Sequence, residues 1–254
     1  MKNAYITVVN DKSYLKGIKA LTYQINAYSK FPLIIVATND LKEELEEFKK
    51  KKNVIVEYRD NIELNVKFNN YDYRNSHWTK TFYKFCIFEF SMYDKLVYLD
   101  SDLYIDSNVD DLFNYNHISA VSDSDFMMEE RFGLNSGVLV FHPDISIYSE
   151  LITCAISMVE SGMVIGDQDV MSKVFVEWSI DKALHLPVYF NSNIALVDNY
   201  GESPKIVHFI GPKKPWNMNY IELIARFTLN FILFKHKKNL FLYKYLKIIK
   251  KANR

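Results

Sequence analysis

Three pairs of aspartates, each pair separated by one residue, are the side chains of this sequence best placed to do chemistry. They are Asp100 with Asp102, Asp123 with Asp125, and Asp167 with Asp169. Two carboxylates that leave a strand together can turn toward one divalent cation, and Mg²⁺ and Mn²⁺ prefer such oxygen ligands, often shared with substrate phosphates. A pair of this kind is a weak signal by itself, because the same pattern also arises on solvated loops and at helix caps.

The elements around these pairs decide which of them can form a site. The hydrophobic pattern predicts strands over residues 4–9, 32–38, 53–59, 95–100, 118–122, 134–142 and 203–211. It predicts helices over residues 13–30, 41–52, 77–93, 146–161 and 168–178. Strands that alternate with helices indicate an α/β fold with a mostly parallel sheet. Ligands of such sheets bind beyond the carboxyl ends of the strands, and Asp100 and Asp102 lie at one of these ends.

The composition indicates one globular domain followed by a tail. Of the 254 residues, 49% are hydrophobic and 24% are charged, which excludes a disordered chain, and no linker interrupts residues 1–216.

Two isolated cysteines, Cys86 and Cys154, favour a reducing compartment over a disulfide scaffold. The start of the chain does not have the form of a signal peptide, so we expect a cytoplasmic protein. We expect no nucleic-acid partner, because the body is acidic and no nucleic-acid-binding motif is recognised.

Residues 217–254 have a different character from the rest of the chain. They hold nine Lys or Arg and a single acid, Glu222. The spacing of apolar residues over 239–251 predicts an amphipathic helix. Residues 220–234 are mostly apolar, but this run is too short to span a membrane. The apolar face of the predicted helix consists of Phe241, Leu242, Tyr245, Ile248 and Ile249. Residues 235–254 can therefore lie on the cytoplasmic face of an anionic membrane, or pack on the acidic body or on a second subunit of a homodimer.

Five segments in one order carry a resemblance to a known family. They are "YLDSDLYIDSNVDDLF", "LNSGVLVFHP", "GDQDVMSKVF", "LPVYFNSN" and "KIVHFIGPKKPW". Together with the opening "AYITVVNDKSYLKG", they resemble the family 8 glycosyltransferases, and most of all the glycogenins, over residues 1–216. The resemblance implies a single GT-A domain, which is a nucleotide-binding α/β fold, and a retaining hexosyltransferase. It also implies a UDP-sugar donor, UDP-glucose first and UDP-galactose second, and a divalent metal, usually Mn²⁺, with Mg²⁺ as the alternative.

The resemblance also assigns the groups that would hold the metal and the diphosphate. Asp100, Asp102 and His208 resemble the protein ligands of the metal. Lys214 in "GPKKPW" resembles the lysine that binds the diphosphate, and a lysine charge beside phosphate is chemically expected. Gly211 would let the backbone approach the phosphates closely.

Further residues resemble the donor pocket of the family. Those at the uridine are Val8, Asn10, Asp11 and Tyr14. Those near the diphosphate and the sugar are Arg74, Lys84, Ser101, Asp123, Asn135 and Ser136. Beside the anomeric carbon, Asp167 and Gln168 resemble the catalytic pair, and Lys84 is expected to help stabilise the departing diphosphate.

The acceptor is less well defined, because the sequence departs from the glycogenin pattern. Val164 and Ile165 stand where glycogenins carry an additional acid, and Tyr200 is the only tyrosine near the place of their glucosylated tyrosine. A glycan, a lipid-linked glycan and a protein tyrosine all stay open as acceptors. The alternatives to a glycan-extending enzyme are a self-glucosylating primer protein and an inactive scaffold that binds UDP-sugar. The complete set of predicted metal and phosphate ligands argues against the inactive scaffold.

Overall fold

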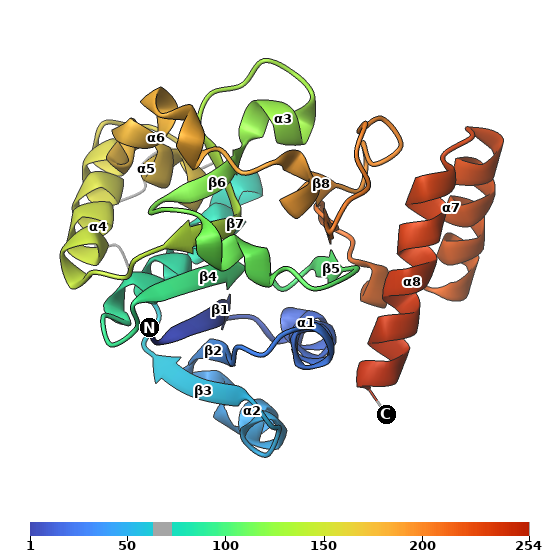
Figure 1. Ribbon diagram of the computed structural model, residues 1–254, viewed down its shortest axis with the longest axis horizontal. Coiled ribbons are helices and arrows are strands. Elements are labelled where there is room, and N and C mark those ends of the chain that lie inside the picture. The colour runs from blue at the N-terminus through green and yellow to red at the C-terminus, as the bar shows by residue number, and fades with distance from the viewer. Residues whose placement is uncertain (63–72, 254) are drawn as a thin grey trace.

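A computed structural model shows how the chain folds (Figure 1). It describes residues 1–62 and 73–253, and of residues 73–79 only the secondary structure. Strands and helices alternate through most of its length, as the hydrophobic pattern predicts.

The central sheet is built from strands that are largely apolar on both faces. In spatial order it contains β3, Val54–Arg59; β2, Leu33–Thr38; β1, Asn3–Val9; β4, Lys95–Leu99; β7, Leu134–Phe141; and β6, Ser119–Ser122. β7 runs antiparallel to both of its neighbours, so the other five strands share one direction. The predicted mostly parallel sheet is confirmed.

Helices cover both faces of this sheet, because successive side chains of a strand point to opposite sides. In β1, for example, Tyr5 belongs to one apolar core and Ile6 to the other. The core around Tyr5 is covered by α1, Leu15–Tyr28, and α2, Lys42–Lys49. The core around Ile6 is covered by the 3₁₀ helix η3, Tyr73–Glu89, by α4, Ile145–Glu160, and by α5, Asp167–Val174.

One predicted helix was wrong in its extent. The helix predicted over residues 168–178 is two helices, α5 and α6 (Val176–Ile180), because the backbone of Phe175 leaves the helical conformation between them. Short elements complete the described chain: α3, Asp123–Met127; η1, Lys12–Tyr14; η2, Asn39–Leu41; η4, Asp110–Asn114; η5, Lys182–Leu184; η6, Val188–Phe190; and η7, Pro215–Asn217.

A second sheet, of three strands, joins the middle of the chain to its C-terminal third. It contains β5, Leu103–Ile105; β9, Ile206–His208; and β8, Ser192–Asn193. Antiparallel pairing sets Leu103 opposite His208, and the N–H of Phe209 donates to the backbone oxygen of Asp102 at 3.0 Å. β9 confirms the strand predicted at 203–211. β5 and β8 were not predicted, since two or three residues are too few to show an alternation.

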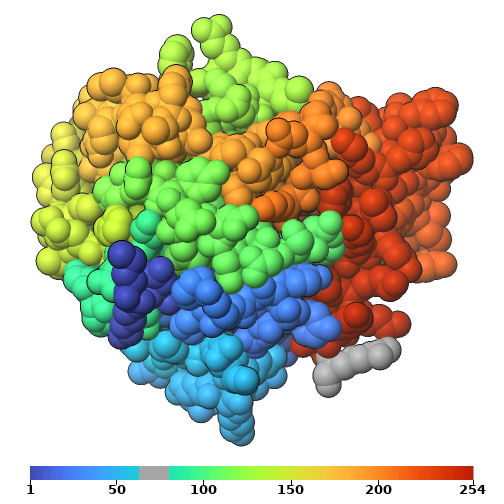
Figure 2. Space-filling model, viewed as in Figure 1, coloured from blue at the N-terminus to red at the C-terminus, as the bar shows by residue number. Residues whose placement is uncertain are grey.

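The C-terminal segment forms two helices that lie together on one side of the molecule (Figures 1 and 2). They are α7, Tyr220–Ile232, and α8, His236–Ala252. Four of the five apolar residues predicted for one face of α8 are buried against the body, with Ala20, Tyr104, Phe209 and Trp216. Lys244 of α8 also pairs with Asp106 of the body at 2.7 Å.

This face of α8 therefore packs on the acidic body, one of the alternatives that the sequence left open, and does not face a membrane. None of the helices in the described ranges is both long enough and apolar enough to cross a membrane. The boundary at residue 216 stays a prediction.

Tyr245 is the residue on which we expect the attachment of α8 to depend most. It is fully buried, and its ring centroid lies 4.7 Å from that of Phe209 and 6.1 Å from that of Trp216. Tyr245→Ala should lower the free energy of unfolding in urea by about 3–5 kcal/mol, because a large ring is replaced by a cavity.

Tyr245→Phe is the matched control, since the buried hydroxyl of Tyr245 has no hydrogen-bond partner among the described residues. Removing an unsatisfied buried hydroxyl should leave stability unchanged or raise it slightly. Equal losses in the two variants would show that the hydroxyl, and not the packing of the ring, holds the helix.

Candidate active site

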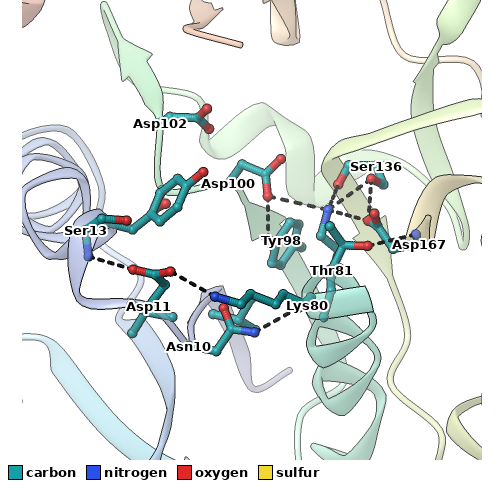
Figure 3. Close-up of a pocket in the computed structure, with 15 residues that line it drawn as sticks. Asn10, Asp11, Ser13, Lys80, Thr81, Tyr98, Asp100, Asp102, Ser136 and Asp167 are labelled. Carbon is teal, nitrogen blue, oxygen red and sulfur yellow. Dashed lines mark hydrogen bonds and ion pairs between the residues drawn. The ribbon is translucent and has the colours of Figure 1, made fainter. Parts of the chain in front are cut away.

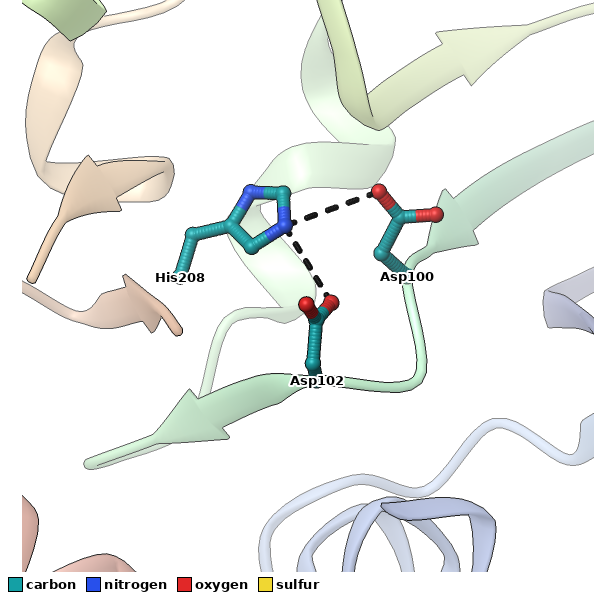
Figure 4. A group of neighbouring side chains, drawn as sticks. All are labelled: Asp100, Asp102 and His208. Carbon is teal, nitrogen blue, oxygen red and sulfur yellow. Dashed lines mark ion pairs between the residues drawn. The ribbon is translucent and has the colours of Figure 1, made fainter. Parts of the chain in front are cut away.

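Asp100, Asp102 and His208 meet where the two sheets come together (Figure 4). Asp100 follows β4, Asp102 precedes β5, and the pairing of β5 with β9 brings His208 beside them. Nε2 of His208 lies 3.2 Å from Oδ1 of Asp102 and 3.7 Å from Oδ2 of Asp100. One ligand atom of each residue lies within 4.8 Å of the other two, so the three side chains can reach one cation.

The two carboxyls respond differently to their shared burial. Burial raises the pKa of Asp100, and the charges of Lys84 and His208 do not fully offset it. At Asp102, burial is outweighed by His208 and Lys214, which hold the pKa of that carboxyl well below its usual range. Asp100 is therefore short of positive charge, and a cation bound between the two aspartates would supply it.

A pocket of about 470 Å³ lies next to this cluster (Figure 3). Ten of the predicted site residues line it: Val8, Asn10, Asp11, Tyr14, Lys84, Asp100, Ser101, Asp102, Ser136 and Asp167. They come from the ends of β1 and β4, from η3, and from β7 and α5. Residues that are far apart in the sequence thus meet at one edge of the sheet, as the α/β fold requires.

Lys84 is the central cation of the pocket. Its Nζ lies 2.7 Å from Oδ2 of Asp167, 3.4 Å from Oδ1 of Asp100 and 2.9 Å from Oγ of Ser136. Burial lowers the pKa of Lys84, but the two aspartates outweigh it and raise the pKa overall. In the same way Lys84 outweighs burial at Asp167 and lowers the pKa of that carboxyl. Both groups are therefore charged at neutral pH.

Lys214 supplies a second buried cation on the other side of Asp102. Its Nζ donates to Oδ2 of Asp102 at 2.5 Å and to the backbone oxygen of Phe209 at 3.2 Å. It also lies 5.7 Å from the ring centroid of Tyr14. Gly211, in the turn before Lys214, has φ of +107°, a conformation that favours glycine.

The predicted uridine residues beyond the carboxyl end of β1 are held by Lys80, Ser13 and Trp216. The side chain of Asn10 donates to the backbone oxygen of Lys80 at 2.8 Å. Asp11 caps η1 by accepting from the N–H of Ser13 at 2.9 Å, and its other oxygen pairs with Nζ of Lys80 at 3.3 Å. The ring of Tyr14 meets Trp216 edge to face, with 6.3 Å between centroids.

The other predicted residues lie beside the pocket or outside the described side chains. Nδ2 of Asn135 donates to Asp123 at 3.2 Å, and Oε1 of Gln168 accepts from the N–H of Ser136 at 3.4 Å. Asn135, Asp123 and Gln168 do not belong to the described lining of the pocket. Arg74 falls in the part of η3 whose side chains lie outside the described residues.

Several residues of the site had no predicted role, and three of them bond predicted metal or sugar residues. Tyr98 donates its hydroxyl to Oδ1 of Asp100 at 2.5 Å, and Oγ1 of Thr81 accepts from the N–H of Asp167 at 3.1 Å. Oδ1 of Asn191 lies within hydrogen-bond distance of Nδ1 of His208, at 3.1 Å. Two of these three could have been found from the sequence, because Tyr98 stands in "YLDSDLYIDSNVDDLF" and Asn191 in "LPVYFNSN", both segments that carry the family resemblance.

Replacing Lys84 by methionine should destabilise the protein in a pH-dependent way. The variant leaves Asp167 and Asp100 without their shared buried cation, so the free energy of unfolding should fall by about 3–5 kcal/mol at neutral pH. In the wild type, the lowered pKa of Asp167 contributes stability above its unfolded pKa of about 3.9, and this contribution is lost as the pH falls through the folded pKa.

In Lys84→Met the carboxyls no longer have this partner, so their folded pKa values rise and they protonate earlier. The stability gap between variant and wild type should therefore narrow below about pH 5, as urea titrations at several pH values would show. Lys80→Met is the control, because the Lys80 side chain is 59% exposed and its pair with Asp11 is worth about 1 kcal/mol or less. A gap that widens toward acid would contradict this account of the site.

Comparisons with known proteins agree with this geometry. A family model described as "Glycosyl transferase family 8" matches residues 5–220. Glycogenin-1 of Mus musculus is 34% identical over 138 residues, which cover 51% of this chain and 40% of that protein. Glycogenin-1 of Caenorhabditis elegans is 28% identical over 232 residues, which cover 85% of this chain and 51% of that protein. The chain thus matches about half or less of the length of these relatives.

Solved structures show the same fold. An active-site mutant of LgtC superposes with a TM-score of 0.64 at 15% identity, covering 84% of this chain and 89% of its own. GlyE of Streptococcus pneumoniae TIGR4 superposes with a TM-score of 0.63 at 17% identity, covering 98% of this chain and 63% of its own. The predicted GT-A fold is confirmed. Since the family model covers most of the chain, the protein belongs to glycosyltransferase family 8.

Proposed function

We propose that the protein is a metal-dependent, retaining hexosyltransferase that moves glucose, or as second choice galactose, from a UDP-sugar to a hydroxyl acceptor. The observation that carries this is the position of Asp100, Asp102 and His208 beside the pocket, between Lys84 and Lys214. A divalent cation flanked by lysines is the combination that neutralises a departing diphosphate. Glucose is first because of the glycogenin relatives, and galactose second because a solved LgtC complex is titled a galactosyltransferase.

The donor set of the cluster fits Mn²⁺, with Mg²⁺ as the alternative. Two carboxylates and one imidazole are ligands that Mn²⁺ accepts, and their atoms lie close enough to share one ion. The raised pKa of Asp100 also indicates unmet positive charge. When bound there, the ion would act as a Lewis acid toward the oxygens of the diphosphate.

The residues of the chain would then orient the donor. Val8, Asn10, Asp11 and Tyr14 would hold the nucleoside at the end of β1. Lys214, and with it Lys84, would stabilise the charge that builds on the departing diphosphate. Asp167 is kept ionised by Lys84, so it can accept hydrogen bonds from the sugar hydroxyls.

In the proposed reaction the bond between the anomeric carbon and the diphosphate oxygen breaks, and the acceptor oxygen bonds to the same face of the sugar. The acceptor proton passes to the departing phosphate. We favour this front-face attack over a covalent intermediate, because Asp167, the carboxylate beside the sugar position, is already bound to Lys84 at 2.7 Å and to Oγ of Ser136 at 2.7 Å. A carboxylate held in this way is a poor nucleophile.

The state of Tyr200 favours a glycan acceptor over self-glucosylation at this residue. Its side chain is 6% exposed, and its hydroxyl donates to the backbone oxygen of Phe126 at 2.7 Å and accepts from the N–H of Asn193 at 3.2 Å. A hydroxyl engaged on both sides is not available as an acceptor. The inactive scaffold is less favoured, because the predicted metal ligands and both lysines are assembled in one site.

The first test is release of UDP from a panel of UDP-sugars with Mn²⁺, for the wild type and for Asp102→Asn. One sugar should be turned over, and turnover should stop when Mn²⁺ is removed with EDTA. Asp102→Asn should lower turnover by about 100-fold or more, the usual effect of losing a principal electrostatic group.

Asp125→Asn is the matched control, because this exposed aspartate belongs to the second pair and has no place in the pocket described. Its turnover should equal that of the wild type. If the wild-type protein fails to bind UDP in the Mn²⁺ buffer, the proposed function is wrong.

The exposed side of α7 favours a lipid-linked glycan as the acceptor. Eight large apolar side chains of α7 and the turn after it are exposed: Tyr220, Ile221, Ile224, Leu229, Phe231, Ile232, Leu233 and Phe234. The segment 217–254 around them carries nine basic residues and one acid. Apolar side chains inside a basic surround suit the cytoplasmic surface of an anionic bilayer. The predicted membrane contact over 235–254 is thereby moved, in this proposal, to α7 and the turn.

Binding to vesicles tests this surface. The wild type should co-sediment with vesicles of phosphatidylglycerol and phosphatidylcholine, and less with phosphatidylcholine alone or in high salt. Phe231→Ser with Phe234→Ser should weaken binding by about tenfold or more, since each buried aromatic contributes about 1.5–3 kcal/mol. Phe132→Ser, a change at a residue 93% exposed on a loop of the body, should have no effect. Equal binding by all variants would rule out α7 as the contact.

A further inference from the structure

A chain of side-chain amides runs from the metal candidates to the predicted sugar residues. Nδ1 of His208 and Oδ1 of Asn191 are 3.1 Å apart. Nδ2 of Asn191 donates to Oδ1 of Asn135 at 2.7 Å, and Nδ2 of Asn135 donates to Oδ1 of Asp123 at 3.2 Å. All four side chains are buried, so the bonds are shielded from water and orient their members strictly.

The bonds of Asn135 fix the direction of this chain. An amide group can in principle be turned end for end, which exchanges its donor and its acceptor. Oδ1 of Asn135, however, also accepts from the backbone N–H of Gly137 at 3.1 Å, and an N–H can only donate. At the other side of Asn135 stands the carboxylate of Asp123, which accepts. Asn135 therefore presents oxygen to Asn191, and Asn191 must present its own oxygen to His208.

The direction of the chain determines where the imidazole carries its proton. An amide oxygen accepts only, so Nδ1 of His208 must hold a hydrogen. In the neutral ring Nε2 then has a free electron pair, and Nε2 is the nitrogen that faces Asp100 and Asp102. The ring lies close against Gly137, where a Cβ would come within 2.6 Å of its Cε1, so this position has no room for a side chain.

We propose that Asn191 is a positioning residue of the metal site: it fixes the ring proton of His208 on Nδ1 and keeps Nε2 open toward the cation. Without this acceptor, the neutral ring could carry its proton on Nε2 and donate it to Asp102, only 3.2 Å away. Nε2 of His208 would then have no free electron pair for a cation, and Asp102 would be occupied by the hydrogen bond. Asn191 prevents this, and the role rests on the metal assignment of the proposed function.

The position of the proton can be read without any variant. ¹⁵N NMR of histidine-labelled protein, with the His208 signals assigned through His208→Gln, reports which ring nitrogen is protonated. Nδ1 should be protonated both in metal-free protein and after addition of Mg²⁺. An unprotonated Nδ1 in either state would overturn the inference.

The effect on the metal is measured by titrating Mn²⁺ into donor-free protein in a calorimeter. Asn191→Leu should bind Mn²⁺ about 10–100-fold more weakly, the usual effect of losing a group that orients a ligand, and should lose the fixed proton on Nδ1. Asn191→Asp keeps an acceptor at Nδ1 and should recover most of the affinity. Asn230→Leu removes a buried amide that bonds Asn239 of α8, and should change neither readout.

The outcomes separate this role from the proposed function. If a folded Asn191→Leu binds Mn²⁺ as tightly as the wild type, Asn191 has no positioning role. If the wild type binds no Mn²⁺, the metal assignment is wrong, while the NMR measurement still decides whether Asn191 fixes the proton of His208. If Asn191→Leu does not fold, the wild-type NMR result and Asn191→Asp decide the question.

Discussion

Two neighbouring carboxylates, Asp102 buried and Asp100 with 25% of its side chain exposed to the pocket, are the constraint on which the rest of this structure depends. Burial disfavours their charged forms, so the fold must bring positive charge to them. Lys84 comes from η3, His208 from the end of β9, and Lys214 from the segment after it. These elements are distant in sequence, and they meet because η3 packs on the central sheet and β9 pairs with β5.

Acidic and basic side chains are packed together inside the site. Three carboxylates, those of Asp100, Asp102 and Asp167, face the two lysines Lys84 and Lys214, with a histidine beside them. Of these three carboxyls, only Asp100 has a pKa that burial raises overall, while the neighbouring cations lower the pKa of Asp102 and Asp167. Charged groups collected in this way are a poor means of stabilising a fold, and the position between Asp100 and Asp102 is a suitable place for a cation.

Local sequence patterns predicted the parts of this architecture that depend on local physics. Strand and helix periodicity predicted the α/β sheet and placed Asp100 and Asp102 at the end of a buried strand. Asp123 also follows a predicted strand, so the choice of Asp100 and Asp102 as metal ligands came from the family resemblance. His208 and Lys214 came from the family resemblance, because no local pattern marks a histidine at a strand end as a ligand. Tyr98 and Thr81 were not predicted. The bond of Tyr98 to Asp100 is local, but strand periodicity does not show which side chains bond one another, and the bond of Thr81 to Asp167 joins elements that only the tertiary structure brings together.

The amphipathic helix α8 shows a different limit. Its apolar face is visible in the sequence, but the same pattern serves a lipid surface and a protein surface equally well. The outcome depends on whether the body has an apolar surface of its own. Here Tyr104, Phe209 and Trp216 form that surface, and α8 packs on it. The prediction of one continuous helix over 168–178 was wrong for a related reason. The change of backbone conformation at Phe175 does not alter the hydrophobic periodicity of the sequence.

The position of Trp216 makes the basic tail a part of the catalytic body. Its indole N–H donates to the backbone oxygen of Ser13, and its ring leaves no space for a side chain at Gly17, whose Cβ would also strike the backbone of Ser101 between the two aspartates. On its other side the same ring packs on Tyr245 of α8. A shortened protein that ends before α8 would therefore expose an aromatic surface next to the loop that carries Asp100 and Asp102. Exposed aromatic surface of this kind promotes aggregation, so the tail is better studied by point substitutions than by removal.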